Sequence, residues 1–150
     1  MPFDARNWIA GLGPRLAVQA RLLDGLLTAV AADPRWEWLE LGCSVAHGRG
    51  DELSDLDMGL GFSGTNEAPL DDVEAILRGL GQVVEVYDSP WDGFHRWWVQ
   101  YTDGGQIDLV LMPAADRPGA AIPRKRNGRM RLSCPRWKPY NSGLPVLGLI

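Results

Sequence analysis

The stretch from Leu41 to Phe62, LGCSVAHGRGDELSDLDMGLGF, decides the fold of this chain. Asp55 and Asp57 lie two positions apart in its apolar second half. In a β-strand, residues i and i+2 point to the same face, so both carboxylates are expected to project from one side of a sheet. A Gly-rich turn, between Ser44 and Glu52, comes just before them.

A third carboxylate lies in another short apolar run, Gln106-Ile107-Asp108-Leu109-Val110. If this run is a strand beside the first one, Asp108 joins Asp55 and Asp57. Three oxygen donors next to a glycine-rich turn are typical of a site for Mg²⁺ and a nucleotide. Solvated acids are the alternative explanation, but unpaired carboxylates within apolar runs are costly, which favours the metal site.

The periodicity of the apolar residues predicts an α/β (α+β) fold in which a mixed central sheet of about five strands carries helices on one side. The residues between 103 and 105, Asp-Gly-Gly, indicate a hairpin between the last two strands. The expected helices are 14–32 and 69–80, and the expected strands are 36–42, 56–62, 82–87, 96–101 and 106–112.

The charge distribution divides the chain into an acidic part, 1–112, and a basic part, 113–150. Eight of the 15 Lys and Arg residues but only one of the 19 Asp and Glu residues follow Met112. We expect a single catalytic domain over 1–112 and an irregular or disordered Pro/Gly-rich tail over 113–150. The acidic part argues against nucleic-acid binding, whereas the tail could contact either nucleic acid or the acidic domain.

Two further features restrict the classes of protein to which the chain can belong. No stretch approaches the ~20 apolar residues of a membrane helix, and the N-terminus lacks a signal-peptide pattern, so a cytoplasmic location without membrane contact is expected. Cys43 and Cys134 have no metal-type spacing and indicate neither a zinc site nor a disulfide framework.

The segment from Ser44 to Gly48 (SVAHG), followed by Ser54-Asp55-Leu56-Asp57, resembles the signature of the DNA polymerase β-like nucleotidyltransferase superfamily. Within it, the chain is most similar to aminoglycoside-nucleotidyltransferase-like and minimal nucleotidyltransferase proteins. The resemblance implies transfer of a nucleoside monophosphate from a nucleoside triphosphate, with ATP expected, to a hydroxyl acceptor. Pyrophosphate is released.

The resemblance also implies roles for individual residues. Asp55, Asp57 and Asp108 are expected to be catalytic and to bind one or two Mg²⁺ ions. The nucleotide-binding positions are then Gly42, Cys43, Ser44, Arg49 and Ser54. At a tight turn leading into a helix, backbone N–H groups, the Ser44 hydroxyl and Arg49 can hold triphosphate oxygens. The family usually has glycine where this chain has Cys43.

Three interpretations remain open at this point. The acceptor can be a small hydroxylated molecule such as an aminoglycoside. The chain can instead be an antitoxin-type minimal nucleotidyltransferase that modifies a partner protein. It can also be a truncated, non-catalytic remnant, as the cysteine at position 43 and the short region after Met112 suggest. A second copy of the chain, in a homo-oligomer, could complete the acceptor site.

Overall fold

A computed structural model describes residues 3–64, 67–91, 93–117, 125–126, 129–130 and 147–150. The helical elements are α1 (Ala5–Ala10), a 3₁₀ turn η1 (Pro14–Leu16), α2 (Ala17–Ala31), α3 (Cys43–Ala46), α4 (Leu70–Gly79) and a 3₁₀ turn η2 (Ala114–Asp116). The strands are β1 (Trp36–Gly42), β2 (Leu56–Phe62), β3 (Val83–Trp91), β4 (Phe94–Tyr101), β5 (Gln106–Pro113), β6 (Lys125–Arg126), β7 (Arg129–Met130) and β8 (Leu147–Gly148).

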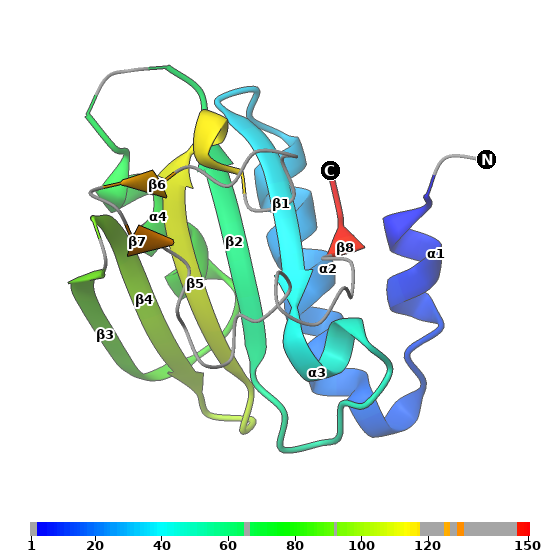
Figure 1. Ribbon diagram of the computed structural model, residues 1–150. Helices are drawn as coiled ribbons and strands as arrows, with labels where there is room; N and C mark the ends of the chain where they lie inside the picture. The colour runs from blue at the N-terminus through cyan, green and yellow to red at the C-terminus, as the bar shows by residue number, and fades with distance from the viewer. Residues whose placement is uncertain (1–2, 65–66, 92, 118–124, 127–128, 131–146) are drawn as a thin grey trace.

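Six strands form the main sheet in the order β3-β4-β5-β2-β1-β8, and β6 pairs with β7 separately. Only the β2–β5 contact is parallel, and the other pairs in the main sheet are antiparallel. Helices α2 and α4 lie behind this sheet (Figure 1). The predicted mixed sheet with helices on one side is therefore confirmed.

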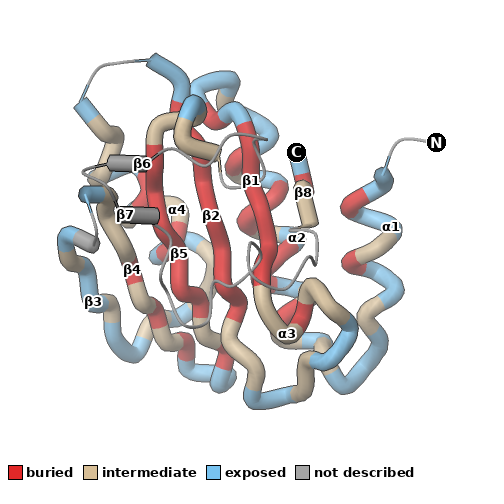
Figure 2. The backbone as a smooth tube through the Cα atoms, in the orientation of Figure 1, coloured by how far each residue is buried: buried red, intermediate tan, exposed pale blue. Residues whose placement is uncertain are grey.

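The hydrophobic core lies between the sheet and the helices. Alternate residues of the central strands face it, such as Leu56, Met58 and Leu60 of β2, and all three are fully buried. Leu23 and Leu77 meet them from α2 and α4. Figure 2 shows the buried backbone concentrated in β1, β2 and β5, whereas β3 at the sheet edge is more exposed.

The residues between these core positions point to the opposite face of the sheet, which we call the open face because α2 and α4 do not cover it. Trp38, Val110 and Met112 form a small apolar cluster there. Trp38 lies across Gly61, where an added Cβ would come within 2.2 Å of the indole, so that this strand position requires glycine. The indole N–H donates to the carbonyl of Ala114 at 2.9 Å, which ties η2 to β1.

Every predicted helix and strand of the acidic part has a counterpart in the structure, although some bounds differ. The strands expected at 82–87 and 96–101 are the longer β3 (Val83–Trp91) and β4 (Phe94–Tyr101). The helix expected from residue 14 begins with a 3₁₀ turn that has Pro14 at its first position, and the α-helix proper begins at Ala17. Helix α1 was not predicted, because its six residues are too short for a periodic pattern. The sheet has a sixth strand, β8, whose two residues carry no sequence signal.

The basic region is described only in part. Residues 114–117 fold into η2 and its continuation, and β8 pairs with β1 through Glu40 and Leu41. Leu149 is buried in the core, and its N–H donates to the carbonyl of Leu39 at 2.7 Å. Most of the predicted basic tail lies outside the described residues, so the division at residue 112 stays a prediction.

Candidate active site

Two of the predicted acids lie side by side on the open face. Asp57 of β2 and Asp108 of β5 are direct partners in the parallel register. They are only 2% and 4% exposed. The neighbours Leu56 and Ile107 point into the core, so the strand alternation forces both carboxylates outward to the same face.

The third acid comes from the turn that leads into β2. Asp55 is half-buried, and the structure brings a carboxylate oxygen from each of Asp55, Asp57 and Asp108 within 4.8 Å of one another. Hard divalent cations such as Mg²⁺ prefer oxygen ligands of this kind. The donor set and its spacing therefore fit a divalent metal ion.

The acid cluster includes a basic partner that the sequence did not reveal. Arg96 of β4 donates through Nε to Asp108 Oδ1 at 2.7 Å, and through a terminal nitrogen to the other carboxylate oxygen. The fork of the guanidinium thus matches the carboxylate in the bidentate geometry that makes strong charge-assisted pairs. Arg96 was missed because its place beside Asp108 depends on the β4–β5 register.

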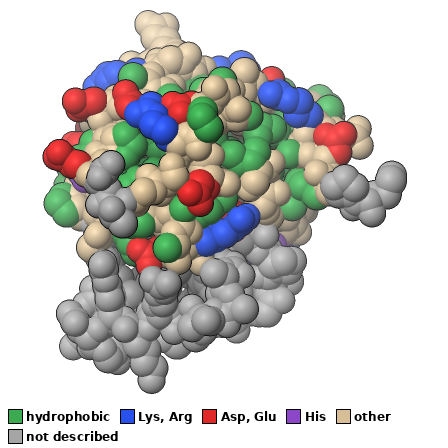
Figure 3. All heavy atoms as spheres, turned by 90° about the horizontal axis from the view of Figure 1, so that it is seen from above, with side chains coloured by type: hydrophobic (Ala, Val, Ile, Leu, Met, Phe, Trp, Pro, Cys, Tyr) green, Lys and Arg blue, Asp and Glu red, His purple; other side chains and the backbone are tan. Residues whose placement is uncertain are grey.

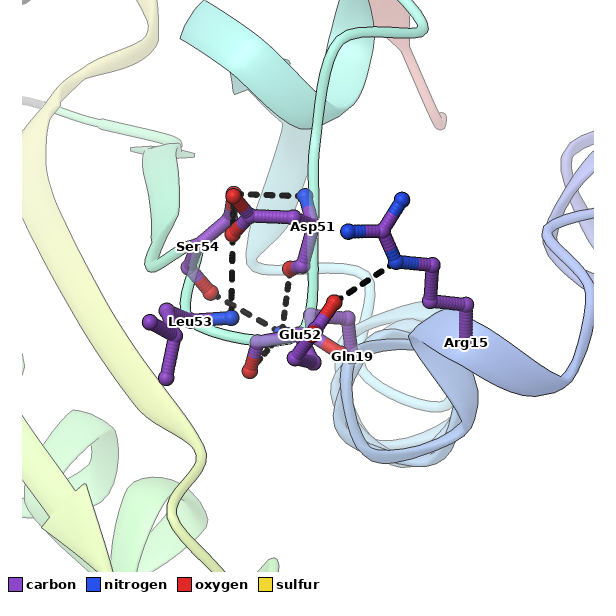
Figure 4. A network of polar contacts seen from close by, with 6 residues as sticks. All are labelled: Arg15, Gln19, Asp51, Glu52, Leu53 and Ser54. Atoms are coloured by element: carbon purple, nitrogen blue, oxygen red, sulfur yellow. Dashed lines mark hydrogen bonds and ion pairs between the residues drawn. The ribbon is translucent and has the colours of Figure 1, made fainter.

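The turn before Asp55 is fixed from beneath by a buried amide (Figure 4). Gln19 of α2 is 2% exposed, and its Nε2 donates to the carbonyls of Asp51, Glu52 and Ser54 at 3.3, 3.3 and 3.0 Å. A buried amide that serves three carbonyls holds the turn against α2. Gln19 lies in the predicted helix, but only the tertiary contact shows its role.

Ser54 and Glu52 also stabilise this turn. The Ser54 hydroxyl accepts from the Asp51 backbone N–H at 2.9 Å and lies 3.1 Å from Asp51 Oδ1. The Glu52 carboxylate accepts a hydrogen bond from its own backbone N–H and another from Arg15 Nε at 2.7 Å, and both lower the pKa of Glu52. Ser54, predicted to contact the nucleotide, therefore has a structural partner in the turn, and its contact with a nucleotide stays a prediction.

The glycine-rich turn between β1 and β2 carries the other predicted nucleotide-binding residues. Gly42 ends β1, and Cys43 and Ser44 form the first half of α3. Arg49 follows in an exposed loop, and its backbone N–H donates to the Ser44 carbonyl at 2.9 Å. Gly42 pairs with Asp57 in the β1–β2 register, so this turn begins next to the acid cluster.

Cys43 has an unusual backbone conformation. Its φ of 59° is the only positive value at a non-glycine residue in the described part of the chain. This left-handed region costs little at glycine and more at residues with a Cβ. The predicted departure from the family pattern thus coincides with the strained position.

A second ion pair lies further along the open face. Glu40 of β1 is 2% exposed, and its Oε1 accepts from Arg117 Nε at 2.5 Å. The Arg117 guanidinium also lies over the Trp38 ring, 5.6 Å from its centroid. Glu40 pairs with Gly59, two residues along the strands from the pair of Gly42 and Asp57. Because side chains two residues apart point the same way, Glu40 lies on the same face as Asp57.

The outer surface shows no further clustered charge in the view from above (Figure 3). Acidic and basic side chains of the described residues are interspersed there rather than gathered in one basic patch. The ion pairs of the described residues mix the two charges as well, since Arg35 pairs with both Asp33 and Asp72 at 2.7 Å. None of the described helices has the length and apolar character needed to cross a bilayer.

Comparison with known proteins gives matches among solved structures only. The chain matches no protein family profile and no curated protein. It resembles the GLD-2/RNP-8 complex (17% identity, TM-score 0.48, 71% of this chain and 46% of that one). It also resembles the non-canonical poly(A) polymerase complex GLD-2–GLD-3 (18%, 0.47, 73% and 40%). A third similar structure is an aminoglycoside 6-adenyltransferase from Bacillus subtilis (15%, 0.43, 63% and 35%).

These similar structures are nucleotidyltransferases, the class that the sequence resembles. The chain spans less than half the length of each of them. At this identity the likeness concerns the fold alone, and the chemistry of the present chain has to be argued from its own side chains.

Proposed function

We propose that this chain is a Mg²⁺-dependent nucleotidyltransferase that transfers a nucleoside monophosphate, from ATP, to a hydroxyl acceptor. The observation that carries the proposal is the convergence of Asp55, Asp57 and Asp108 within 4.8 Å on the open face. In the reaction, the acceptor oxygen forms a bond to the α-phosphorus and the bond between that phosphorus and the α–β bridging oxygen breaks. The nucleotide is thereby divided into the transferred monophosphate and pyrophosphate.

Asp55 and Asp57 are the residues proposed to hold the metal, with Asp108 as the third carboxylate. The bound metal would neutralise charge on the phosphates and stabilise the pyrophosphate leaving group. Asp108 is proposed to take the proton of the attacking hydroxyl, because an ionised carboxylate can accept a proton while its other oxygen serves a second partner.

The turn from Gly42 to Arg49 is proposed to bind the triphosphate. The Ser44 hydroxyl and neighbouring backbone N–H groups would donate to phosphate oxygens, and Arg49 would add a charged fork. Support comes from the position of the turn, whose first residue is the register partner of Asp57. The buried contacts of Gln19 fix residues 51–54, which follow this turn and lead to Asp55.

Calorimetric titration with ATP, in the presence and absence of Mg²⁺, tests the proposal. Wild type is expected to bind ATP in a Mg²⁺-dependent manner, and the Asp55→Asn/Asp57→Asn double variant is expected to lose this dependence. The double variant Asp71→Asn/Asp72→Asn is the matched control, since it makes the same charge change in the first turn of α4, away from the open face. Equal Mg²⁺ dependence in all three proteins would contradict the metal site.

A non-catalytic domain is the second candidate function, and two observations favour it. Cys43 has the strained φ of 59° in the turn proposed to bind phosphate. Arg96 engages both oxygens of Asp108. This candidate predicts that wild type fails to bind Mg²⁺ and ATP at all, whereas the transferase predicts binding and pyrophosphate release with a suitable acceptor.

A further inference from the structure

The acid cluster gathers three carboxylates at a largely buried site. Asp57 and Asp108 are 2% and 4% exposed, and Asp55 brings a third carboxylate within 4.8 Å. Buried charges are retained only when they are paired or coordinate a metal. Arg96 supplies one positive charge at this cluster, through its fork on Asp108.

The geometry allows this arginine to leave. Arg96 lies opposite Val110, next to the Trp98–Asp108 pair, and reaches Asp108 diagonally across the β4–β5 ladder. Its side chain is 33% exposed, whereas that of Asp108 is 6% exposed. The long Arg96 side chain therefore reaches solvent where Asp108 does not, and rotation about its bonds gives the guanidinium a route into water.

We propose that Arg96 is an internal counter-ion that competes with the divalent cation for Asp108. Building on the proposed metal site, the inference is that cation binding and the bidentate Arg96–Asp108 pair exclude each other. A cation at Asp55 and Asp57 recruits Asp108 only when the guanidinium turns outward. Arg96 thus acts through Asp108 and sets how tightly the site holds a metal.

The competition predicts the sign of a substitution effect. If Arg96 only kept Asp108 in place, its removal would loosen the site and weaken metal binding. If Arg96 competes, the Arg96→Gln variant binds metal more tightly. A guanidinium about 4 Å from a divalent cation repels it even at the dielectric constant of water, so its removal is expected to tighten cation binding at least about tenfold.

Titration of wild type and Arg96→Gln with Mn²⁺ alone, followed by electron paramagnetic resonance of the free ion, measures this effect. Arg78→Gln is the matched control, because it removes the same charge from an exposed pair with Glu74 on α4. Its Mn²⁺ affinity is expected to equal that of wild type. Unchanged or weaker binding by Arg96→Gln overturns the competition but leaves the metal site intact, whereas absence of binding in all proteins refutes both.

A second measurement needs no folded Arg96→Gln protein. The Nε–H groups of Arg96 and Arg78 both donate to carboxylates, at 2.7 and 3.1 Å, and give nitrogen–proton correlation signals. Arg96→Lys and Arg78→Lys assign the two signals. Saturation of wild type with Mg²⁺ is expected to shift the Arg96 signal toward that of a solvated arginine and to leave the Arg78 signal in place. An Arg96 signal that stays fixed while calorimetry shows Mg²⁺ binding overturns the proposal.

Discussion

Replacing Cys43 by glycine tests whether the turn between β1 and β2 stores strain. Cys43 has a φ of 59°. The left-handed conformation costs a residue with a Cβ about 1–2 kcal/mol. Replacement by glycine relieves this strain, but about 0.5–1 kcal/mol of the stabilisation is lost again because glycine makes the unfolded chain more flexible. The net expectation is that Cys43→Gly raises the free energy of unfolding by about 0.5–1 kcal/mol.

The assay is equilibrium unfolding in urea together with a thermal melt. For a chain of this length, about 1 kcal/mol corresponds to about 2–4 °C in the melting temperature. Cys43→Ala is the matched control, since it removes the thiol but keeps the Cβ that causes the strain. We expect the alanine variant to be no more stable than wild type, and the glycine variant to be the most stable of the three.

The comparison of the glycine variant with the alanine variant decides whether the turn is strained. A glycine variant that unfolds at the same urea concentration as the alanine variant, or at a lower one, would show that the turn is relaxed around cysteine. The thiol of Cys43, which is half-buried, would then be the reason for its presence. If the strain is confirmed, the same glycine variant should also bind Mg²⁺ and ATP more tightly under the proposed function, because the backbone can approach phosphate.

Three other perturbations follow from buried contacts. The Tyr101 hydroxyl donates to the Leu77 carbonyl at 2.6 Å, and burial raises its pKa. The contribution of this neutral hydroxyl to the free energy of unfolding is therefore complete below about pH 10, the pKa of tyrosine in the unfolded chain. Above that pH the contribution falls by up to about 1.4 kcal/mol per pH unit. Tyr101→Phe should cost about 1 kcal/mol at neutral pH and flatten this alkaline loss in pH-dependent urea unfolding. Gln19→Glu should destabilise more than Gln19→Leu, by about 1 kcal/mol or more in melting experiments, because a carboxylate would face three carbonyl oxygens; equal melting temperatures would contradict this. Arg117→Ala should lower the free energy of unfolding by about 2–3 kcal/mol, and Glu40→Gln by less, because only the first leaves a buried carboxylate without its partner; the reverse order would refute it.

The sequence allowed most of the fold to be predicted, because the informative patterns are local. Leu56, Met58 and Leu60 alternate with Asp57 and two glycines, which marks both the strand and its core face. The turn from Asp103 to Gly105 predicted the hairpin, and Gly104 has the positive φ of 90° that such a turn needs. Element β8 could not be predicted, because its pairing with β1 depends on residues more than a hundred positions away.

The candidate site was predictable only on the acidic side. The spacing of Asp55 and Asp57 indicates a shared face, and the apolar run around Asp108 indicates a neighbouring strand. The sequence has no local signal for Arg96 or Gln19, because each reaches the site through side-chain contacts set by the packing of distant elements. Which side chains meet on one face of a sheet depends on the register of its strands, and that register is set by the packing of the whole core.

The two arginines on the open face give the uneven charge of the sequence a structural explanation. Glu40 and Asp108 are both buried there, and each carboxylate is held by one arginine that is about a third exposed, Arg117 and Arg96. Arg117 belongs to the basic region after Met112, so at least one basic residue of that region compensates an acid of the preceding sheet. Acidic strands can bury their carboxylates only because such partners are available. Loss of the region from Arg117 onward is therefore expected to leave Glu40 without its arginine and to lower the free energy of unfolding.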